Sequence, residues 1–133
     1  MSALLLSLIS LCLTSTLTLR AALPPGWSDA DLSSPALPGS ASCTNGLWTL
    51  SGSGADTCTS DQLHFAFNSV TGDGTVVAQV ESIQNVAGAQ AGIVCRNGAN
   101  SGAPEVAVLA TAGGGISFQW RSTPASGCSY QVV

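Results

Sequence analysis

The acidic side chains best placed to bind a metal flank one predicted turn of the chain. Asp56 and Asp61 lie five residues apart, between the glycine-rich run 52–54 and an alternating apolar run that begins at Leu63. Two carboxylates beside backbone carbonyls are ligands that Ca²⁺ uses. The same aspartates also suit Asx-turns, in which the carboxylate accepts hydrogen bonds from nearby backbone amides. Because no D-x-D-x-D-G string is present, we favour the Asx-turns and expect no cofactor, with Ca²⁺ at Asp56 and Asp61 as the alternative.

The other polar residues do not form a catalytic pattern. Glycoside hydrolysis needs two carboxyl groups facing one bond, but Glu81 and Glu105 stand on different predicted strands and no E-x-D-x-x-E string occurs. The single histidine, His64, has no G-x-S-x-G nucleophile elbow to serve. No C-x-x-C pair is available for zinc. We therefore expect no enzymatic activity, and a remnant of a glycoside hydrolase is kept only as an alternative.

A set of polar residues falls on one side of several predicted strands. Counting by twos along those strands groups the set opposite the apolar positions; its members are His64, Gln79, Glu81, Arg96, Glu105, Gln119 and Arg121. The candidate ligand-binding residues, which can hydrogen-bond sugar hydroxyls, are His64, Glu81, Arg96, Gln119 and Arg121. Trp48 is the aromatic candidate for stacking. The alternative is a solvated face whose cross-strand Glu–Arg pairs contribute about 0.2–1 kcal/mol each.

Short strands separated by turns are expected to position these residues. Leu63, Phe65 and Phe67 alternate with other residues at the period of a half-buried strand, and Asn45-Gly46 favours a tight hairpin. The predicted strands span residues 40–43, 47–51, 63–69, 75–84, 91–96, 105–111, 116–122 and 128–133. Their spacing indicates an all-β antiparallel sandwich. Its core is expected to include Phe65, Phe67, Ala78, Val80, Ile93, Ile116, Phe118 and Trp120.

The N-terminus has the pattern of a secretory signal peptide. Residues 3–13 form an apolar run, and the small residues Ala21 and Ala22 follow as a cleavage site. We therefore divide the chain into a signal peptide at 1–22, an irregular lead-in at 23–39 and a β-sandwich domain at 40–133. The expected location is extracellular, with no membrane span after cleavage. An uncleaved signal acting as an anchor is the alternative.

The charge of the chain excludes one class of partner, and its cysteine content indicates the compartment in which it is expected. The 133 residues include three arginines and no lysine, so there is no basic footprint for a nucleic acid. Four cysteines follow the signal, and in an oxidising compartment they suggest two disulfides with three possible connectivities. Proximity in the sequence favours Cys43–Cys58 and Cys95–Cys128.

Five segments together resemble a known class of module. They read G-S-A-S-C-T-N-G-L-W-T-L-S-G-S-G-A-D (39–56), D-Q-L-H-F-A-F (61–67), G-D-G-T-V-V-A-Q-V (72–80), A-G-I-V-C-R (91–96) and G-I-S-F-Q-W-R (115–121). Their order and spacing are similar to the concanavalin A-like lectin/glucanase jelly-roll modules, in the style of DUF1349 and laminin-G-like secreted domains. The resemblance covers about residues 31–123. The cysteines depart from it, since they occupy positions that are aromatic or aliphatic in the family.

The resemblance implies a jelly-roll sandwich with a role in carbohydrate binding or extracellular adhesion, and a glycan or polysaccharide as partner. The family domain continues with further strands beyond the region matched by Arg121, so we expect a C-terminally truncated sandwich or an incomplete gene model. Missing strands expose apolar sheet surface and open edges, which favour pairing with another chain. A structural extracellular or cell-wall component that associates with itself or with another protein through such an edge is therefore the alternative function.

Overall fold

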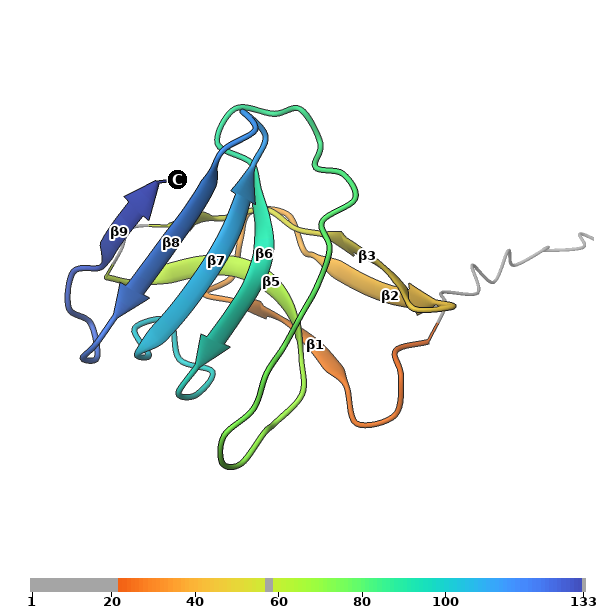
Figure 1. The fold of residues 1–133 in the computed structure, drawn as a ribbon, viewed down its shortest axis with the longest axis horizontal. Coiled ribbons are helices and arrows are strands. Elements are labelled where there is room, and N and C mark those ends of the chain that lie inside the picture. The colour runs from red at the N-terminus through yellow and green to blue at the C-terminus, as the bar shows by residue number, and fades with distance from the viewer. Residues whose placement is uncertain (1–21, 57–58, 133) are drawn as a thin grey trace, which may run out of the picture.

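The computed structural model describes residues 22–56 and 59–132, and within them it is built from antiparallel strands without a helix (Figure 1). The strands are β1 (Ser28–Leu32), β2 (Ser40–Thr44), β3 (Leu47–Ser51), β4 (Ala55–Asp56), β5 (Asp61–Phe67), β6 (Gln90–Arg96), β7 (Glu105–Thr111), β8 (Ile116–Arg121) and β9 (Ser129–Val132). The prediction of an all-β antiparallel fold is confirmed. No helix in the described part of the chain is long and apolar enough to cross a membrane. The predicted signal peptide lies outside the described residues, except for Ala22.

The strands form two layers in Figure 1. A four-stranded sheet in the order β6-β7-β8-β9 lies in front, and the sheet β1-β5-β4 lies behind it together with the hairpin β2-β3. Every neighbouring pair of strands is antiparallel. The buried apolar side chains are mostly small, namely Leu32, Ala41, Ala103 and Ala107.

The hairpin predicted at Asn45-Gly46 is confirmed. Both residues have positive φ angles, 52° and 82°, as a two-residue turn between right-twisted strands requires. The turn sets the register that places Cys43 opposite Trp48.

The first difference from the sequence analysis is at residues 23–39, which were predicted to be irregular. They contain β1, which pairs along its whole length with β5 and places Asp31 opposite His64. This strand is not apparent from the polar, proline-flanked sequence, because the alternation is short and the partner strand lies more than thirty residues away.

The second difference is at residues 75–84, predicted to be the longest strand. The described structure has no strand between Phe67 and Gln90. Val76 and Val77 are 56% and 87% exposed, and the segment runs beside β6 in Figure 1. An alternating sequence forms a strand only where a neighbouring edge takes up its backbone hydrogen bonds. In the described part of the chain, β6 pairs with β7 alone.

The third difference is the direction in which β8 faces. Its buried residues are Ser117, Gln119 and Arg121, whereas Ile116 and Phe118 are 48% and 38% exposed. The period of two was correct, but the two faces are exchanged relative to the prediction. A period of two separates two faces without saying which is covered, and here the polar face of β8 lies against β5.

Candidate functional site

Four charged side chains meet between the two layers. Arg96 on β6, Glu105 on β7 and Arg121 on β8 are directly opposite one another across the sheet, so they form one row on its inner face. Asp61, at the start of β5, completes the cluster from the other layer. We call these four residues the buried ion cluster.

The two arginines share the two carboxylates. Arg121 donates from Nη1 to Asp61 Oδ1 at 3.0 Å, and its Nη2 lies 3.0 Å from Glu105 Oε1. Arg96 Nη1 donates to Asp61 Oδ2 at 2.6 Å. Arg121 Nη2 also pairs with Asp61 Oδ2, and Arg96 Nη1 with Glu105 Oε2. The positive charges of the two arginines are thus matched by the carboxylates of Asp61 and Glu105.

The buried ion cluster also holds the loop between β6 and β7. Arg121 Nε donates to the carbonyl of Ala103 at 2.9 Å, and Arg96 Nη2 donates to the carbonyl of Asn100 at 2.8 Å. The amide of Asp61 donates to the carbonyl of Ser101 at 3.0 Å. Charged donors thereby satisfy carbonyls that lie outside the strands. The cluster fixes both layers and this loop to one another.

Burial and charge shift the two carboxyl groups in opposite directions. Burial raises the pKa of Asp61, but the hydrogen bonds from Arg121 and Arg96 outweigh burial, so its pKa falls below the ordinary 3.8. Burial raises the pKa of Glu105 above the ordinary 4.5, and the attraction of Arg96 does not fully offset it because Asp61 lies nearby.

The cluster is a structural anchor rather than a surface for a ligand. Side-chain exposure is 0% for Arg121, 3% for Asp61, 5% for Arg96 and 11% for Glu105. Gln119 is buried as well, at 8%. The expectation that Arg96, Gln119 and Arg121 line an open groove is therefore not met, because β8 turns its polar side inward. Sequence parity did bring the two arginines together with Glu105.

The other two candidate ligand residues lie elsewhere. Glu81 is exposed on the segment between β5 and β6. His64 points to the other side of β5 from Asp61, where its Nδ1 is 2.8 Å from Asp31 Oδ1 and its Nε2 is 3.3 Å from Asp29 Oδ2. Its side chain is 4% exposed. The five candidates therefore do not form a single face.

Asp31 links β1, His64 and the chain before β2. Its carboxylate accepts the amide of Gly39 at 2.9 Å. The hydrogen bond with His64, followed by the one from Gly39, lowers the pKa of Asp31 below 3.8. A Cβ at Gly39 would lie 2.1 Å from His64 Cγ, so only glycine allows the chain to pass over the imidazole.

Asp56 and Asp61, the two Ca²⁺ candidates, are neighbours in the structure but are not both available to a metal ion. Asp61 and Asp56 are partners in the β4–β5 ladder, but the carboxylate oxygens of Asp61 are taken up by guanidinium groups. Within residues 22–56 and 59–132, no group of three or more His, Cys, Asp or Glu side chains is arranged to hold a metal ion.

The predicted disulfide pairings are wrong. Cys43 and Cys95 carry free thiols, so neither Cys43–Cys58 nor Cys95–Cys128 is formed. Cys95 is on β6, and Cys128 immediately precedes β9 at the opposite edge of the sheet. Three strand spacings of about 4.8 Å separate those edges, whereas a disulfide joins Cα atoms less than about 7 Å apart. Cys58 lies outside the described residues.

The surface that the sequence analysis did not identify is the outer side of the four-stranded sheet. Residues opposite one another in the ladders form rows that share this side, such as Cys95–Val106–Trp120 and Ile93–Val108–Phe118. We call this surface the outer face; it consists of Ala91, Ile93, Cys95, Val106, Val108, Ala110, Ile116, Phe118 and Trp120. The alternation that was used to predict a core had already selected four of these residues, namely Ile93, Ile116, Phe118 and Trp120.

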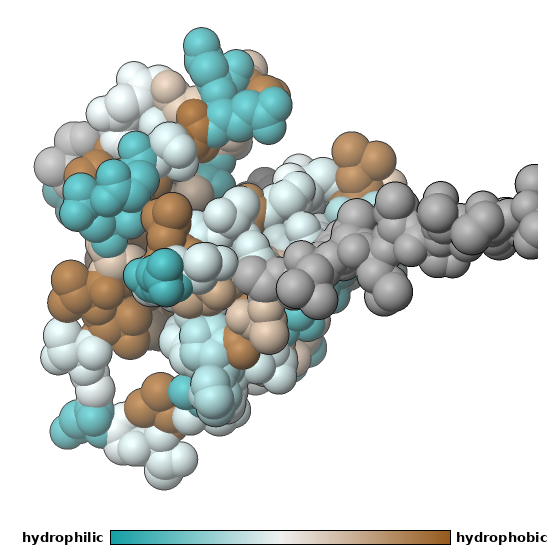
Figure 2. All heavy atoms as spheres, turned by 90° about the vertical axis from the view of Figure 1, so that its right-hand side faces the viewer, coloured by the Kyte–Doolittle hydropathy of each residue, from teal (hydrophilic) through white to brown (hydrophobic). Residues whose placement is uncertain are grey.

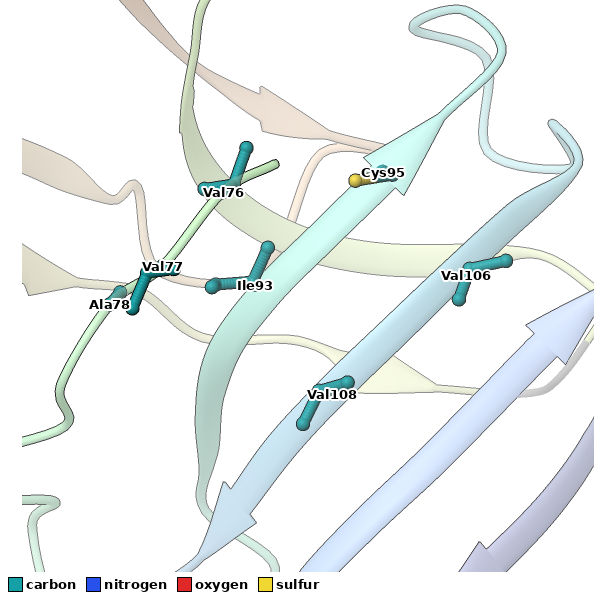
Figure 3. A pocket seen from close by; sticks show the side chains of 7 residues that line it. All are labelled: Val76, Val77, Ala78, Ile93, Cys95, Val106 and Val108. Atoms are coloured by element: carbon teal, nitrogen blue, oxygen red, sulfur yellow. The ribbon is translucent and has the colours of Figure 1, made fainter. Parts of the chain in front are cut away.

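The outer face is apolar and exposed. Val106, Val108 and Ile116 are 45–48% exposed, and the rings of Phe118 and Trp120 lie 5.4 Å apart. Apolar residues also reach the surface at several places in the space-filling view (Figure 2). On the β6 side, a groove of about 380 Å³ is lined by Val76, Val77, Ala78, Ile93, Cys95, Val106 and Val108 (Figure 3).

Comparison with known proteins does not add to this description. No protein-family model matches the chain, and neither the curated proteins nor the solved structures give a match.

Proposed function

We propose that this protein is a secreted, non-catalytic module of extracellular adhesion, built as a concanavalin-like sandwich, and that it associates with a second copy of itself through the outer face. The observation that carries the proposal is the contiguous apolar side of β6, β7 and β8. Exposed apolar patches of this kind are typical of protein interaction sites.

The charge distribution favours a second copy as the partner. The chain has a formal net charge of −4, which opposes self-association at most places on its surface. The outer face has no acidic or basic side chain, and its one titratable group is the Cys95 thiol. Two copies that meet there bury apolar side chains and no unpaired charge. In addition, β9 pairs only with β8 among the strands that the structure describes, so its free edge offers backbone hydrogen bonds to a neighbour.

Analytical ultracentrifugation over micromolar to millimolar concentrations tests this proposal. We expect reversible self-association of the wild type. Phe118→Glu places a charge at the centre of the outer face and should weaken the association at least tenfold. Thr44→Glu adds the same charge at the exposed C-terminal end of β2 and serves as the matched control. A wild type that stays monomeric, or two variants that behave alike, would refute association through the outer face.

Glycan binding is the second candidate function, and it is supported by a different feature. Trp27 and Trp48 have ring centroids 4.7 Å apart, tilted by 55°, and Trp27 is 36% exposed. Paired indoles at a surface offer an apolar platform to a sugar ring. Titration with laminarin oligosaccharides, monitored by calorimetry, should detect heat that Trp27→Ala abolishes and that Phe118→Glu leaves unchanged. Absence of heat with the wild type argues against this candidate.

A further inference from the structure

The segment that runs beside β6 has the sequence of a strand but not its hydrogen bonds. Residues 75–84 alternate Val76, Ala78 and Val80 with Val77, Gln79 and Glu81. Among the described residues, the backbone bonds outside the ladders include none made by 69–83. We call residues 75–84 the strap.

The neighbour of the strap is a strand with a free edge. Within residues 22–56 and 59–132, β6 pairs with β7 on one side and with no strand on the other. In Figure 3, Val77 of the strap lies beside Ile93 of β6, and Val76 and Ala78 flank it. The strap and β6 therefore line one groove, and each has unpaired backbone groups that the other could take up.

The connection between them contains a hydrogen-bonded four-residue turn that reverses the chain. The amide of Ala89 donates to the carbonyl of Val86 at 3.0 Å, and Gly88 has a φ of 80°. A positive φ at the third position of a four-residue turn is the signature of type II, which favours proline at the second position. That second position is Ala87.

We propose that the strap closes onto the free edge of β6 as an added antiparallel strand, and that closing extends the four-stranded sheet and places Val80 beside Cys95 on the outer face. Val76, Val77 and Ala78 all line the groove at present, whereas a pleated strand directs alternate side chains to opposite sides. Closing therefore directs the Val77 side chain to the opposite side of the strand from Val76 and Ala78, and it gives the strap a regular extended backbone. The closing step stands independently of the proposed function, and only its effect on association rests on it.

Hydrogen exchange of the dilute monomer, followed residue by residue by NMR, tests the closing step. In the wild type, alternate amides of the strap should exchange at least about tenfold more slowly than in a free chain. The double variant Gln79→Pro/Val80→Pro should abolish this protection. The turn at residues 86–89 places Gln79 opposite Arg96 and Val80 opposite Cys95 when the strap is closed. Neighbouring amides of a strand point in opposite directions, so one of the two prolines must remove a donor that faces β6.

Two further measurements make the test decisive. Ala87→Pro fits the turn and should increase protection of the strap. Alkylation of Cys95 by N-ethylmaleimide should be faster in the double-proline variant and slower in Ala87→Pro, while Cys43 on β2 reacts equally in all three. Protected amides in β5 and β7 show that each variant is folded. Free-chain exchange of the strap in all three proteins, with unchanged Cys95 reactivity, overturns the proposal; it does not affect the ultracentrifugation test of the outer face.

Discussion

At the scale of single residues, this protein places four of its scarce charged side chains inside. Asp61, Arg96, Glu105 and Arg121 occupy the space between the layers where a larger domain has aliphatic side chains. Desolvating such groups is costly, and the cost is offset only when every charge has a partner and good hydrogen bonds. The arrangement makes each member of the buried ion cluster dependent on the others.

Arg121→Ala should lower the free energy of unfolding by about 3–5 kcal/mol, because it leaves buried carboxylates with one cation fewer and removes the donor to Ala103. Urea denaturation measures the loss. Glu81→Gln, on an exposed segment, serves as the control and should stay within about 0.5 kcal/mol of wild type. A loss for Arg121→Ala no larger than that of the control contradicts the structural role of the cluster.

Glu105→Gln should change how stability depends on pH. The pKa of Glu105 is raised by folding, so the folded protein binds a proton there that the unfolded chain does not bind until about pH 4.5. This group therefore adds stability as the pH falls from neutral towards 4.5, and that stability is lost as the pH rises through the folded pKa. The variant should show a smaller rise in unfolding free energy over this range.

Asp61 acts with the opposite sign and at lower pH. Because folding lowers its pKa below 3.8, its contribution is present above that value and is lost as the pH falls through the folded pKa. The difference between the wild type and Glu105→Gln in urea denaturation between pH 7 and 4.5 therefore reports on Glu105 rather than on Asp61. Parallel stability curves for the wild type and Glu105→Gln would contradict the raised pKa.

At the scale of elements, the ladders are held close together by residues with little or no side chain. Gly92 on the inner side of β6 is opposite Leu109, and a Cβ there would lie 2.0 Å from the carbonyl oxygen of Val108. The obstacle is backbone, which cannot rotate away as the end of a side chain can. The approach of β6 to β7 thus requires glycine at this position.

Gly92→Ala should destabilise the protein by about 1–3 kcal/mol, the range typical of an overpacked site. Gly127→Ala is the matched control, since a Cβ at that position meets no atom within 4 Å. Thermal unfolding followed by circular dichroism compares the two variants. Equal midpoints for both would show that β6 can move away from β7 at little cost.

At the scale of the whole molecule, the four-stranded sheet is covered on the side that carries the polar residues and open on the apolar side. Val108 is 47% exposed on the outer face, and its neighbour Ala107 is 4% exposed on the inner face. The inside and outside of the protein are thus decided by which side of β7 faces β5.

Substituting threonine at these two adjacent positions tests that assignment. Val108→Thr keeps the β-branch on an exposed face and should change the unfolding free energy by less than about 0.5 kcal/mol. Ala107→Thr adds volume and a hydroxyl where no space is available and should cost about 1–3 kcal/mol. Chemical denaturation of the monomer measures both. A larger loss of unfolding free energy for Val108→Thr than for Ala107→Thr would show that the inner and outer faces are assigned the wrong way round.

The sequence by itself determined the all-β antiparallel class, the Asn45-Gly46 hairpin and the common side of Arg96, Glu105 and Arg121. These follow from local turn geometry and from the period of two, which act over a few residues.

Only the tertiary structure decided which side of each strand is covered, where Asp61 and His64 find their partners, and which predicted strands acquire a neighbour. Parity divides a strand into two sides but leaves the choice of inside to the layer that packs against it. That choice placed two of the predicted ligand residues, Arg96 and Arg121, in a buried ion cluster and left several predicted core residues on an exposed surface. It also left residues 75–84 without a ladder, because a strand exists only where another edge completes its hydrogen bonds.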